Sequence, residues 1–281
     1  MKPFKNVITG LAVVVAVMAG TPAVAGGAET GGVADAYRVV AGAVQAGHVP
    51  IAVFDLDETL VYSHARKVLS YKEAAKQLAT TNPAEAAKVE RLGLEQIELL
   101  ENAYDSGAHL AAMGIGDSAF GAKLIKEMFG IYLGGGLMEY DRDVPCATSF
   151  VRDLASMGAH IVYVSSRFDG SQRQGTVKSL ARLRMPVDGA NAAVADGAEL
   201  ILRPEGMNSI DFKRMAFDRI AQIRLVGGRP TEVVLAFENE PENINAMMDA
   251  FPGAGAYFIK GARFSNDALR PGIREIRDYC L

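Results

Sequence analysis

The sequence has few of the features that mark a nucleic-acid-binding, membrane-surface or zinc protein. No cluster of lysine and arginine runs along one face, and the formal net charge is -4 over 281 residues, so neither nucleic acid nor an anionic membrane is indicated as a partner. Only four histidines are present, and His48, His109 and His160 lack the spacing of a zinc site. The remaining composition, 49% hydrophobic and 22% charged, is typical of a globular protein with a sizeable core.

Cysteine is also scarce, with only Cys146 and Cys280 in the chain. No histidine lies close to either one in the sequence, which argues against a cysteine nucleophile. In an oxidising compartment the two could form a disulfide if their Cα atoms came within about 7 Å. Two partly buried thiols are an equally open alternative.

Long apolar runs are absent except near the N-terminus. Lys2 and Lys5 precede an apolar run over residues 7–19, and residues 23–25 read Ala-Val-Ala, the pattern of a signal peptide cleaved after Ala25. The run is shorter than the ~18 to 20 residues that a spanning helix needs, so an uncleaved anchor is the less favoured alternative. We expect a periplasmic or secreted protein with no stable membrane span after processing; its 27 basic and 33 acidic residues would give a formal charge of -6.

The alternation of strand and helix patterns predicts the fold class. Strands are expected at residues 50–56, 161–164, 200–202, 232–237 and 257–259, and helices at 34–45, 145–157, 172–183, 211–223 and 241–248. Short β-rich runs separated by amphipathic helices favour an α/β protein with a Rossmann-like parallel sheet and helices on both faces.

The chain divides into four parts by composition. Residues 1–25 are the signal peptide, residues 26–62 contain a linker, a helix and the first core strand, and residues 143–281 contain the rest of the core and a C-terminal tail. Residues 63–142 predict a mainly helical cap inserted after the first strand, because residues 65–111 are rich in Ala, Glu, Leu and Lys at helical spacing. Glycines at 114, 116, 121 and 134–136 are compatible with hinges of a mobile cover.

Two aspartates follow the first strand directly. The apolar residues 51–54 lead into Asp55 and Asp57, which can project to the same side at the carboxyl end of the strand, where open α/β sheets bind ligands. Carboxylates held so close repel each other unless a cation or a proton intervenes. The position therefore predicts chemistry that divides acid and nucleophile roles around a divalent metal.

Three later segments offer complementary groups. The strand at 161–164 leads to Ser165, whose hydroxyl can donate to a phosphoryl oxygen. The helix at 211–223 carries Lys213 near its start, where an ammonium can reach a bound phosphate; Arg214 and Lys178 are alternatives. The strand at 232–237 ends at Glu238, a hard oxygen ligand that suits magnesium.

In this order, residues 54–60 (Phe-Asp-Leu-Asp-Glu-Thr-Leu), Ser165, Lys213 and Glu238 resemble the four motifs of the haloacid dehalogenase (HAD) superfamily of phosphohydrolases. The resemblance covers roughly residues 48–62 and 143–260, and the helical segment between the first two motifs resembles the family's first-position cap. An acid two residues after the nucleophile fits phosphoryl transfer and not carbon–halogen cleavage.

The resemblance implies a role for each of these residues. Asp55 would be the nucleophile that becomes an aspartyl phosphate, and Asp57 the general acid and base. Ser165 and Lys213 would bind the substrate phosphate. Mg²⁺ would be bound by Asp55, the backbone carbonyl of Asp57 and Glu238. The implied function is an exported magnesium-dependent phosphomonoesterase that hydrolyses small phosphate esters.

Departures from the family pattern keep alternatives open. The fourth motif usually reads Gly-Asp with another Asp further on, whereas here Glu238 stands in that place with Glu242 or Asn243 downstream. Glu58 stands where glycine is frequent, a feature shared with secreted acid phosphatases, but the absence of tryptophan makes that similarity partial. Two alternatives therefore stay open. One is a phosphotransferase or phosphomutase with the same intermediate, and the other is a catalytically silent binding protein with this fold.

Three other polar residues receive a structural interpretation. Arg167 and Arg203 end strands, and packing or surface pairing is favoured over contact with substrate. His64, just beyond the first motif, is interpreted as a loop histidine.

Overall fold

The computed structural model describes residues 32–98, 104–116, 118–187, 198–225 and 228–281. The expected signal peptide and the first part of the linker lie outside the described residues. In the described part, no helix has the length and apolar character needed to cross a membrane.

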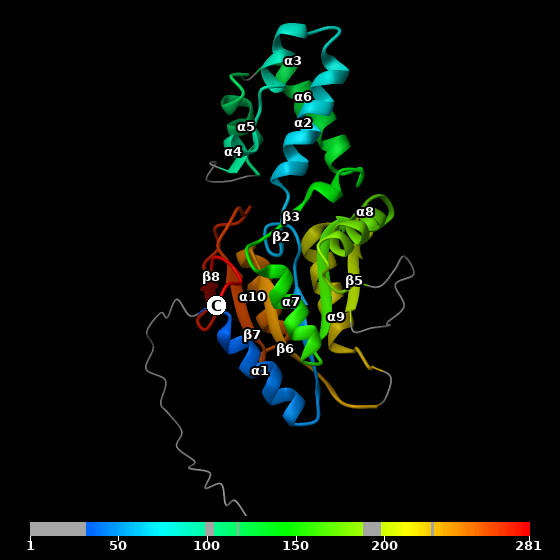
Figure 1. The fold of residues 1–281 in the computed structure, drawn as a ribbon, viewed down its shortest axis with the longest axis vertical. Helices are drawn as coiled ribbons and strands as arrows, with labels where there is room; N and C mark the ends of the chain where they lie inside the picture. Colours follow the sequence, from blue (N-terminus) through cyan, green and yellow to red (C-terminus); the bar gives the residue numbers. More distant parts are fainter. Residues whose placement is uncertain (1–31, 99–103, 117, 188–197, 226–227) are drawn as a thin grey trace, which may run out of the picture.

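A six-stranded parallel sheet forms the core of the molecule (Figure 1). Its order is β5 (Ala198–Arg203), β4 (His160–Phe168), β1 (Val49–Phe54), β6 (Thr231–Glu238), β7 (Gly255–Ile259) and β8 (Arg274–Ile276). From β1 the chain builds outward first through β4 and β5, and then on the other side through β6, β7 and β8. The carboxyl ends of β4, β1 and β6 therefore lie at the point where the strand order reverses, which is where open α/β sheets bind ligands.

Helices cover both faces of the sheet, as the sequence predicts. Ala52 and Phe54 of β1 face α1 (Ala34–Gln45) and α7 (Ala147–Ser156). Ile51 and Val53, one position out of phase, face α9 (Ser209–Ala221) and α10 (Pro241–Ala250). α8 (Asp169–Arg182) contributes Leu180 to the first cluster. Because β1 is buried on both faces, its sequence is apolar at every position and shows no alternation.

A mainly helical cap is inserted between β1 and β4 and stands beyond one end of the sheet (Figure 1). It contains α2 (His64–Leu78), α3 (Pro83–Val89), α4 (Leu94–Glu98), α5 (Ser106–Ala112), α6 (Ala119–Tyr132) and the 3₁₀ helix η1 (Met138–Tyr140). These helices pack around an apolar cluster of their own, which includes Tyr71, Leu92, Ile97 and Leu124. The two chain crossings between cap and core pair as an antiparallel ribbon of β2 (Val61–Tyr62) and β3 (Arg142–Asp143).

The glycine run at 134–136 has a packing role in this structure. Gly135 has φ +78°, and a Cβ added there would lie 2.5 Å from the backbone oxygen of Ser171 in α8. On the other side, a Cβ on Gly175 would collide with the backbone oxygen of Gly135. Close approach of two backbones therefore requires glycine at these positions.

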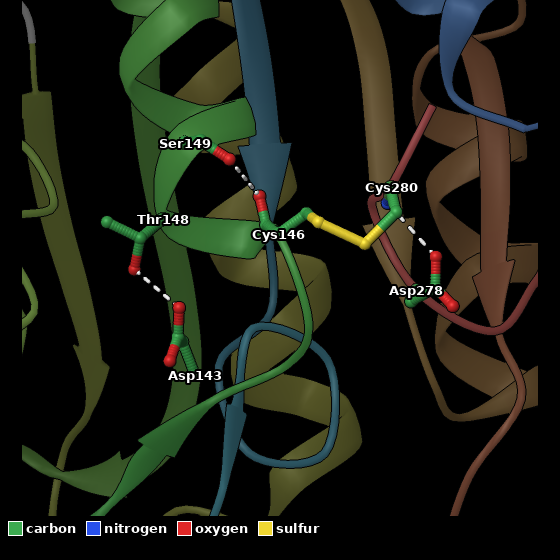
Figure 2. Close-up of a disulfide and its surroundings, with 6 residues drawn as sticks. All are labelled: Asp143, Cys146, Thr148, Ser149, Asp278 and Cys280. Atoms are coloured by element: carbon green, nitrogen blue, oxygen red, sulfur yellow. Dashed lines mark hydrogen bonds between the residues drawn. A yellow bond between two sulfur atoms is a disulfide. The ribbon is translucent and has the colours of Figure 1, made fainter.

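A disulfide joins Cys146 to Cys280, with Cα atoms 5.1 Å apart (Figure 2). Cys146 directly precedes α7, and Cys280 is the second residue from the C-terminal end. The bond holds the end of the chain against the core, and it decides between the two alternatives that the sequence leaves open.

Several element boundaries differ from the sequence prediction. β4 continues to Phe168, four residues beyond the predicted strand, and so contains Ser165. β1 ends at Phe54, so Asp55 and Asp57 belong to the loop that follows it. α9 begins at Ser209 because the side chain of Asn208 accepts a hydrogen bond from the backbone N–H of Asp211, a capping role that the sequence prediction missed. The three-residue strand β8 lies in the segment predicted as a tail.

Candidate active site

The predicted site residues of the core come together at the carboxyl ends of three neighbouring strands. Asp55 follows β1, Ser165 lies in β4 and Glu238 ends β6. The backbone N–H of Asp55 donates to the carbonyl of Phe237, so the loop after β1 continues to follow β6. Asp55, Ser165 and Glu238 are all buried and line the same cavity.

Lys213 binds two of these residues directly. Its Nζ donates to Asp55 Oδ1 at 2.5 Å, to Glu238 Oε2 at 2.9 Å and to the backbone carbonyl of Val164 at 2.9 Å. The side chain is only 1% exposed, and although burial lowers its pKa, the two carboxylates outweigh burial and raise it. Lys213 is the fifth residue of α9, a full turn after Ser209, and so it does not lie at the first residue of the helix.

The cluster carries excess negative charge. Burial and the neighbouring Glu238 carboxylate raise the pKa of Asp55 to about 7, against the opposing effect of the Lys213 ammonium. With both carboxylates ionised, the three groups sum to one net negative charge in a buried place. Such a charge favours a further cation or a proton.

Glu238 is fixed by its surroundings. Its Oε1 accepts hydrogen bonds from the backbone N–H groups of Asn239 and Glu240, each at 3.1 Å, while Oε2 accepts from Lys213. The turn after β6 therefore wraps around the longer glutamate side chain. These contacts hold the Glu238 carboxylate beside Asp55, with Lys213 bound to both.

The donor groups fit the divalent cation that the resemblance implies. In the described part of the chain, no three histidine, cysteine, aspartate or glutamate side chains form a group that could hold a metal ion. The implied set needs only two carboxylates, Asp55 and Glu238, together with the backbone carbonyl of Asp57. Hard oxygen donors with one uncompensated negative charge suit Mg²⁺, which keeps several of its waters.

The residues downstream of Glu238 have separate roles. Glu242 is exposed and does not line the cavity, whereas Asn243 is buried and does. Glu240 accepts hydrogen bonds from the backbone N–H groups of Phe264 and Ser265, which fixes the loop after β7. Of the two candidates for a supporting role at the metal, only Asn243 is placed at the cavity.

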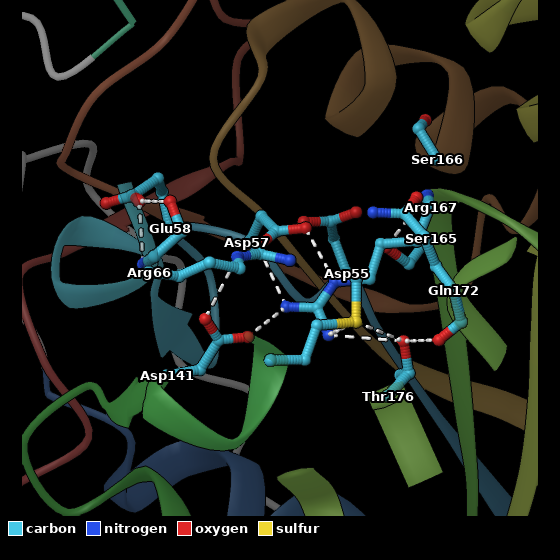
Figure 3. Close-up of polar contacts among 12 residues, drawn as sticks. Asp55, Asp57, Glu58, Arg66, Asp141, Ser165, Ser166, Arg167, Gln172 and Thr176 are labelled. Carbon is cyan, nitrogen blue, oxygen red and sulfur yellow. Dashed lines mark hydrogen bonds and ion pairs between the residues drawn. The ribbon is translucent and has the colours of Figure 1, made fainter. Parts of the chain in front are cut away.

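Asp57 is bound by two arginines (Figure 3). Arg167 donates from Nε to Asp57 Oδ2 and from Nη2 to Asp57 Oδ1, both at 2.8 Å, and Arg66 donates from Nη2 to Oδ1 at 2.6 Å. Burial alone would raise the pKa of Asp57, but Arg167 and Arg66 outweigh it and hold that pKa well below its usual range. Asp57 is therefore ionised in this arrangement.

Asp141 joins Asp57, Arg66 and Arg167 in a group of two acidic and two basic side chains. Its Oδ2 accepts from Arg167 Nη2 at 2.7 Å, and its Oδ1 lies 3.2 Å from Arg66 Nε. Arg66 belongs to the first cap helix, Asp141 to the return crossing and Arg167 to the core, so the cluster ties cap and core together beside Asp57. Fork-shaped pairing of this kind fixes the orientation of a carboxylate as well as its charge.

Sequence reasoning paired neither arginine with Asp57. Arg167, for which packing or surface pairing was favoured over contact with substrate, is buried, pairs with Asp57 and lines the cavity. A usable signal was its place two residues after Ser165, which puts both side chains on one face of an extended strand. Arg66 had no such signal, since it approaches Asp57 through the packing of the cap on the core.

The positions of Glu58 and His64 have a local explanation. Glu58 has φ +61°, a conformation that glycine adopts easily, which is why glycine suits this place. Its carboxylate accepts from the backbone N–H and hydroxyl of Ser63 and lies 3.1 Å from Nε2 of His64. His64 begins α2, and its contact with Glu58 ties the turn after the first motif to the first cap helix.

A cavity of about 290 Å³ opens above these residues, between core and cap. Part of its lining is polar, with side chains from the loops and strand ends of the core: Asp55, Asp57, Ser165, Arg167, Glu238 and Asn239. Apolar and aromatic residues also line it: Tyr104, Met128, Phe129, Tyr132, Leu133 and Phe264. Among these, Tyr132 reaches the charged groups directly, because its hydroxyl accepts a hydrogen bond from Arg66 at 3.1 Å. Lys213 is not part of the wall, so its contacts support a role in balancing charge behind the cavity.

Comparison with known proteins gives a fold likeness only. No family model matches the chain, and no curated protein matches it. Among solved structures, a HAD hydrolase of family IA from Entamoeba histolytica is 15% identical, with 82% of this chain and 94% of that one covered and a TM-score of 0.43. A predicted phosphoglycolate phosphatase from Haemophilus somnus is 16% identical, with 82% and 95% covered and a TM-score of 0.44. At these values, the functional argument rests on the site residues themselves.

Proposed function

We propose that this chain is a phosphomonoesterase of the HAD type that acts on small phosphate esters through a phosphoaspartate at Asp55. The observation that carries the proposal is the meeting of Asp55, Ser165 and Glu238 from three strand ends at one cavity, with Asp57 beside them. Serine hydroxyl, carboxylate nucleophile and acidic metal ligand are the groups that phosphoryl transfer to an aspartate requires.

In the first half of the reaction, a carboxylate oxygen of Asp55 attacks phosphorus and the bond from phosphorus to the ester oxygen breaks. The departing oxygen takes a proton from Asp57. In the second half, Asp57 takes a proton from a water molecule that attacks phosphorus, and inorganic phosphate leaves with Asp55 restored. Ser165 donates to a non-bridging phosphoryl oxygen in both halves.

The arginine pair accounts for the two states that Asp57 needs. With Arg66 and Arg167 on its carboxylate, Asp57 is ionised, which is the form that accepts a proton from water. An arriving phosphoryl group is itself an anion and competes for the same guanidinium groups, which weakens their effect on Asp57 and favours the protonated form needed by the leaving group.

Mg²⁺ is the proposed cofactor, held by Asp55, the backbone carbonyl of Asp57 and Glu238. When bound, it supplies positive charge that lowers the repulsion between the anionic nucleophile and the anionic ester. The excess negative charge of the Asp55, Glu238 and Lys213 group supports this assignment.

We also propose that the protein is exported to the periplasm or secreted. The disulfide between Cys146 and Cys280 supports this placement, because such bonds persist in oxidising compartments. The N-terminal pattern of basic, apolar and small residues supports it independently.

The test is hydrolysis of a generic aryl phosphate by purified mature protein. We expect phosphate release with Mg²⁺, its loss with EDTA, and a fall of at least about a thousandfold for Asp55→Asn, as for loss of a covalent nucleophile. Asp218→Asn, an exposed position on α9, makes the same chemical change away from the site and should keep full activity. Activity of Asp55→Asn close to that of the unmodified protein would refute the assignment.

The same assay separates the alternatives. Turnover with water as the only acceptor would eliminate an obligatory phosphotransferase or mutase. A protein that binds phosphate esters but releases no phosphate under any of these conditions would be the silent binding protein that the altered fourth motif allows.

A further inference from the structure

Most of the apolar residues that line the cavity come from the cap. Met128, Phe129 and Tyr132 come from α6, and Leu133 follows it directly. These residues offer a leaving group apolar surface in the cavity that also contains the charged groups of the core. A cavity with both charged and apolar walls suits an amphipathic ester.

Two aromatic rings from different parts of the chain meet at the cavity wall. Tyr104 lies in the cap between α4 and α5, and Phe264 lies in the core loop between β7 and β8. Their ring centroids are 4.1 Å apart and their planes are inclined by 9°, so the rings stack face to face. Both line the cavity that contains Asp55.

The loop that carries Phe264 is held in place although the Phe264 side chain is exposed. Phe264 is 76% exposed, yet its backbone N–H donates to the carboxylate of Glu240, two residues after Glu238. The loop is thereby tied to the same turn that holds the acidic end of the site. A large apolar ring kept at a cavity wall with so much surface in water gains by contact with a planar ligand.

We propose that Tyr104 and Phe264 form a specificity-determining stacking site for esters whose leaving group carries a planar aromatic ring. This inference rests on the proposed phosphatase function and names its substrate class. The phosphoryl group lies against Asp55 and Ser165, and the ring of the leaving group stacks on the face of Phe264 that Tyr104 leaves open, while Tyr104 supports Phe264 from behind. The Lys67 ammonium, 5.0 Å from the centroid of the Tyr104 ring, adds a cation to the same wall.

A matched pair of substrates tests the inference. 2-Phenylethyl phosphate and 2-cyclohexylethyl phosphate have leaving groups of similar size and similar basicity, and they differ in the planarity of the ring. Stacking should give the phenyl ester a higher kcat/KM by about three- to tenfold in the unmodified protein. Basicity of the leaving group cannot produce this difference, because it is nearly the same in both esters.

Replacement of each ring by leucine keeps apolar surface and removes the planar face. Phe264→Leu and Tyr104→Leu should each bring the two esters to nearly equal kcat/KM, chiefly by raising KM for the phenyl ester. Phe264 lies on an exposed loop, so Phe264→Leu should leave the fold intact. It therefore keeps the test valid even where Tyr104→Leu disturbs the cap. Tyr140→Leu, an exposed tyrosine outside the cavity, should keep the full preference.

The outcomes distinguish this inference from the function on which it rests. Equal hydrolysis of both esters by the unmodified protein, or a preference that survives in both leucine variants, would overturn the stacking site and leave the phosphatase intact. Hydrolysis of neither ester, nor of a generic aryl phosphate, would overturn the phosphatase and the stacking site together.

Discussion

Replacement of Lys213 by methionine should destabilise the protein strongly. The ammonium is buried and donates to Asp55, Glu238 and the backbone carbonyl of Val164. Methionine has a similar length and fills the space, so the change removes charge and hydrogen bonds without a large cavity. Two carboxylates are then left buried beside each other with no cation.

The expected loss in the free energy of unfolding can be estimated from these contacts. Removal of one partner from a buried ion pair costs about 3–5 kcal/mol, because the remaining charge stays buried without compensation. Asp55 can relieve part of this cost by taking up a proton, since its pKa is already raised to about 7 in the presence of Lys213. The loss for Lys213→Met should therefore be larger at pH 8 than at pH 5.

Urea unfolding of the metal-free protein, in the presence of EDTA, measures this loss as a change in the free energy of unfolding. Lys178→Met is the matched control, because Lys178 is exposed on α8, and it should change stability by less than about 0.5 kcal/mol. The double variant Lys213→Met with Asp55→Asn should recover at least half of the loss, since it removes one of the two stranded charges. A loss below about 1 kcal/mol for Lys213→Met, as for an exposed lysine, would refute the buried arrangement.

Three further predictions concern stability. Asp55 has a pKa raised from 3.8 to about 7, so its contribution to stability is fully present below pH 3.8 and is lost as the pH rises through about 7. Asp55→Asn should abolish this part of the pH dependence of the free energy of unfolding measured in urea, and an unchanged pH profile would contradict the prediction. Replacement of Cys146 and Cys280 by serine should cost about 2–5 kcal/mol, because the disulfide closes a loop with a sequence separation of 134; thermal melts that coincide with those of the unmodified protein would count against it. Gly135→Ala should cost about 1–3 kcal/mol because of its positive φ and its contact with α8, whereas Gly136→Ala, with open space around it, should cost less, and equal losses would contradict this reading.

Much of the fold could be predicted because the core strands have a clear sequence pattern. β1, β4 and β6 are short apolar runs whose ends carry Asp55, Ser165 and Glu238, and parallel strands bring their carboxyl ends to one edge. Order along the chain was therefore sufficient to bring these residues together. Amphipathic periodicity placed the flanking helices within a few residues.

The rest depends on contacts that no local pattern encodes. Arg66 reaches Asp57 from the cap, across a packing arrangement that the helical periodicity of residues 65–111 does not specify. The pairing of Cys146 with Cys280 depends on where the C-terminal end returns to the core. The stack of Tyr104 on Phe264 likewise joins cap and core segments far apart in the sequence. In each case tertiary packing supplies the partner.

The most direct test of the account is to find the covalent intermediate. Asp57→Asn removes the proposed base and should stall the enzyme after transfer from an aryl phosphate, whose good leaving group needs no acid. Mass spectrometry of the quenched variant should then show one phosphoryl group on the peptide that contains Asp55, removable by hydroxylamine. A phosphoryl group on another residue, or continued turnover by this variant with no labelled Asp55, would contradict the account.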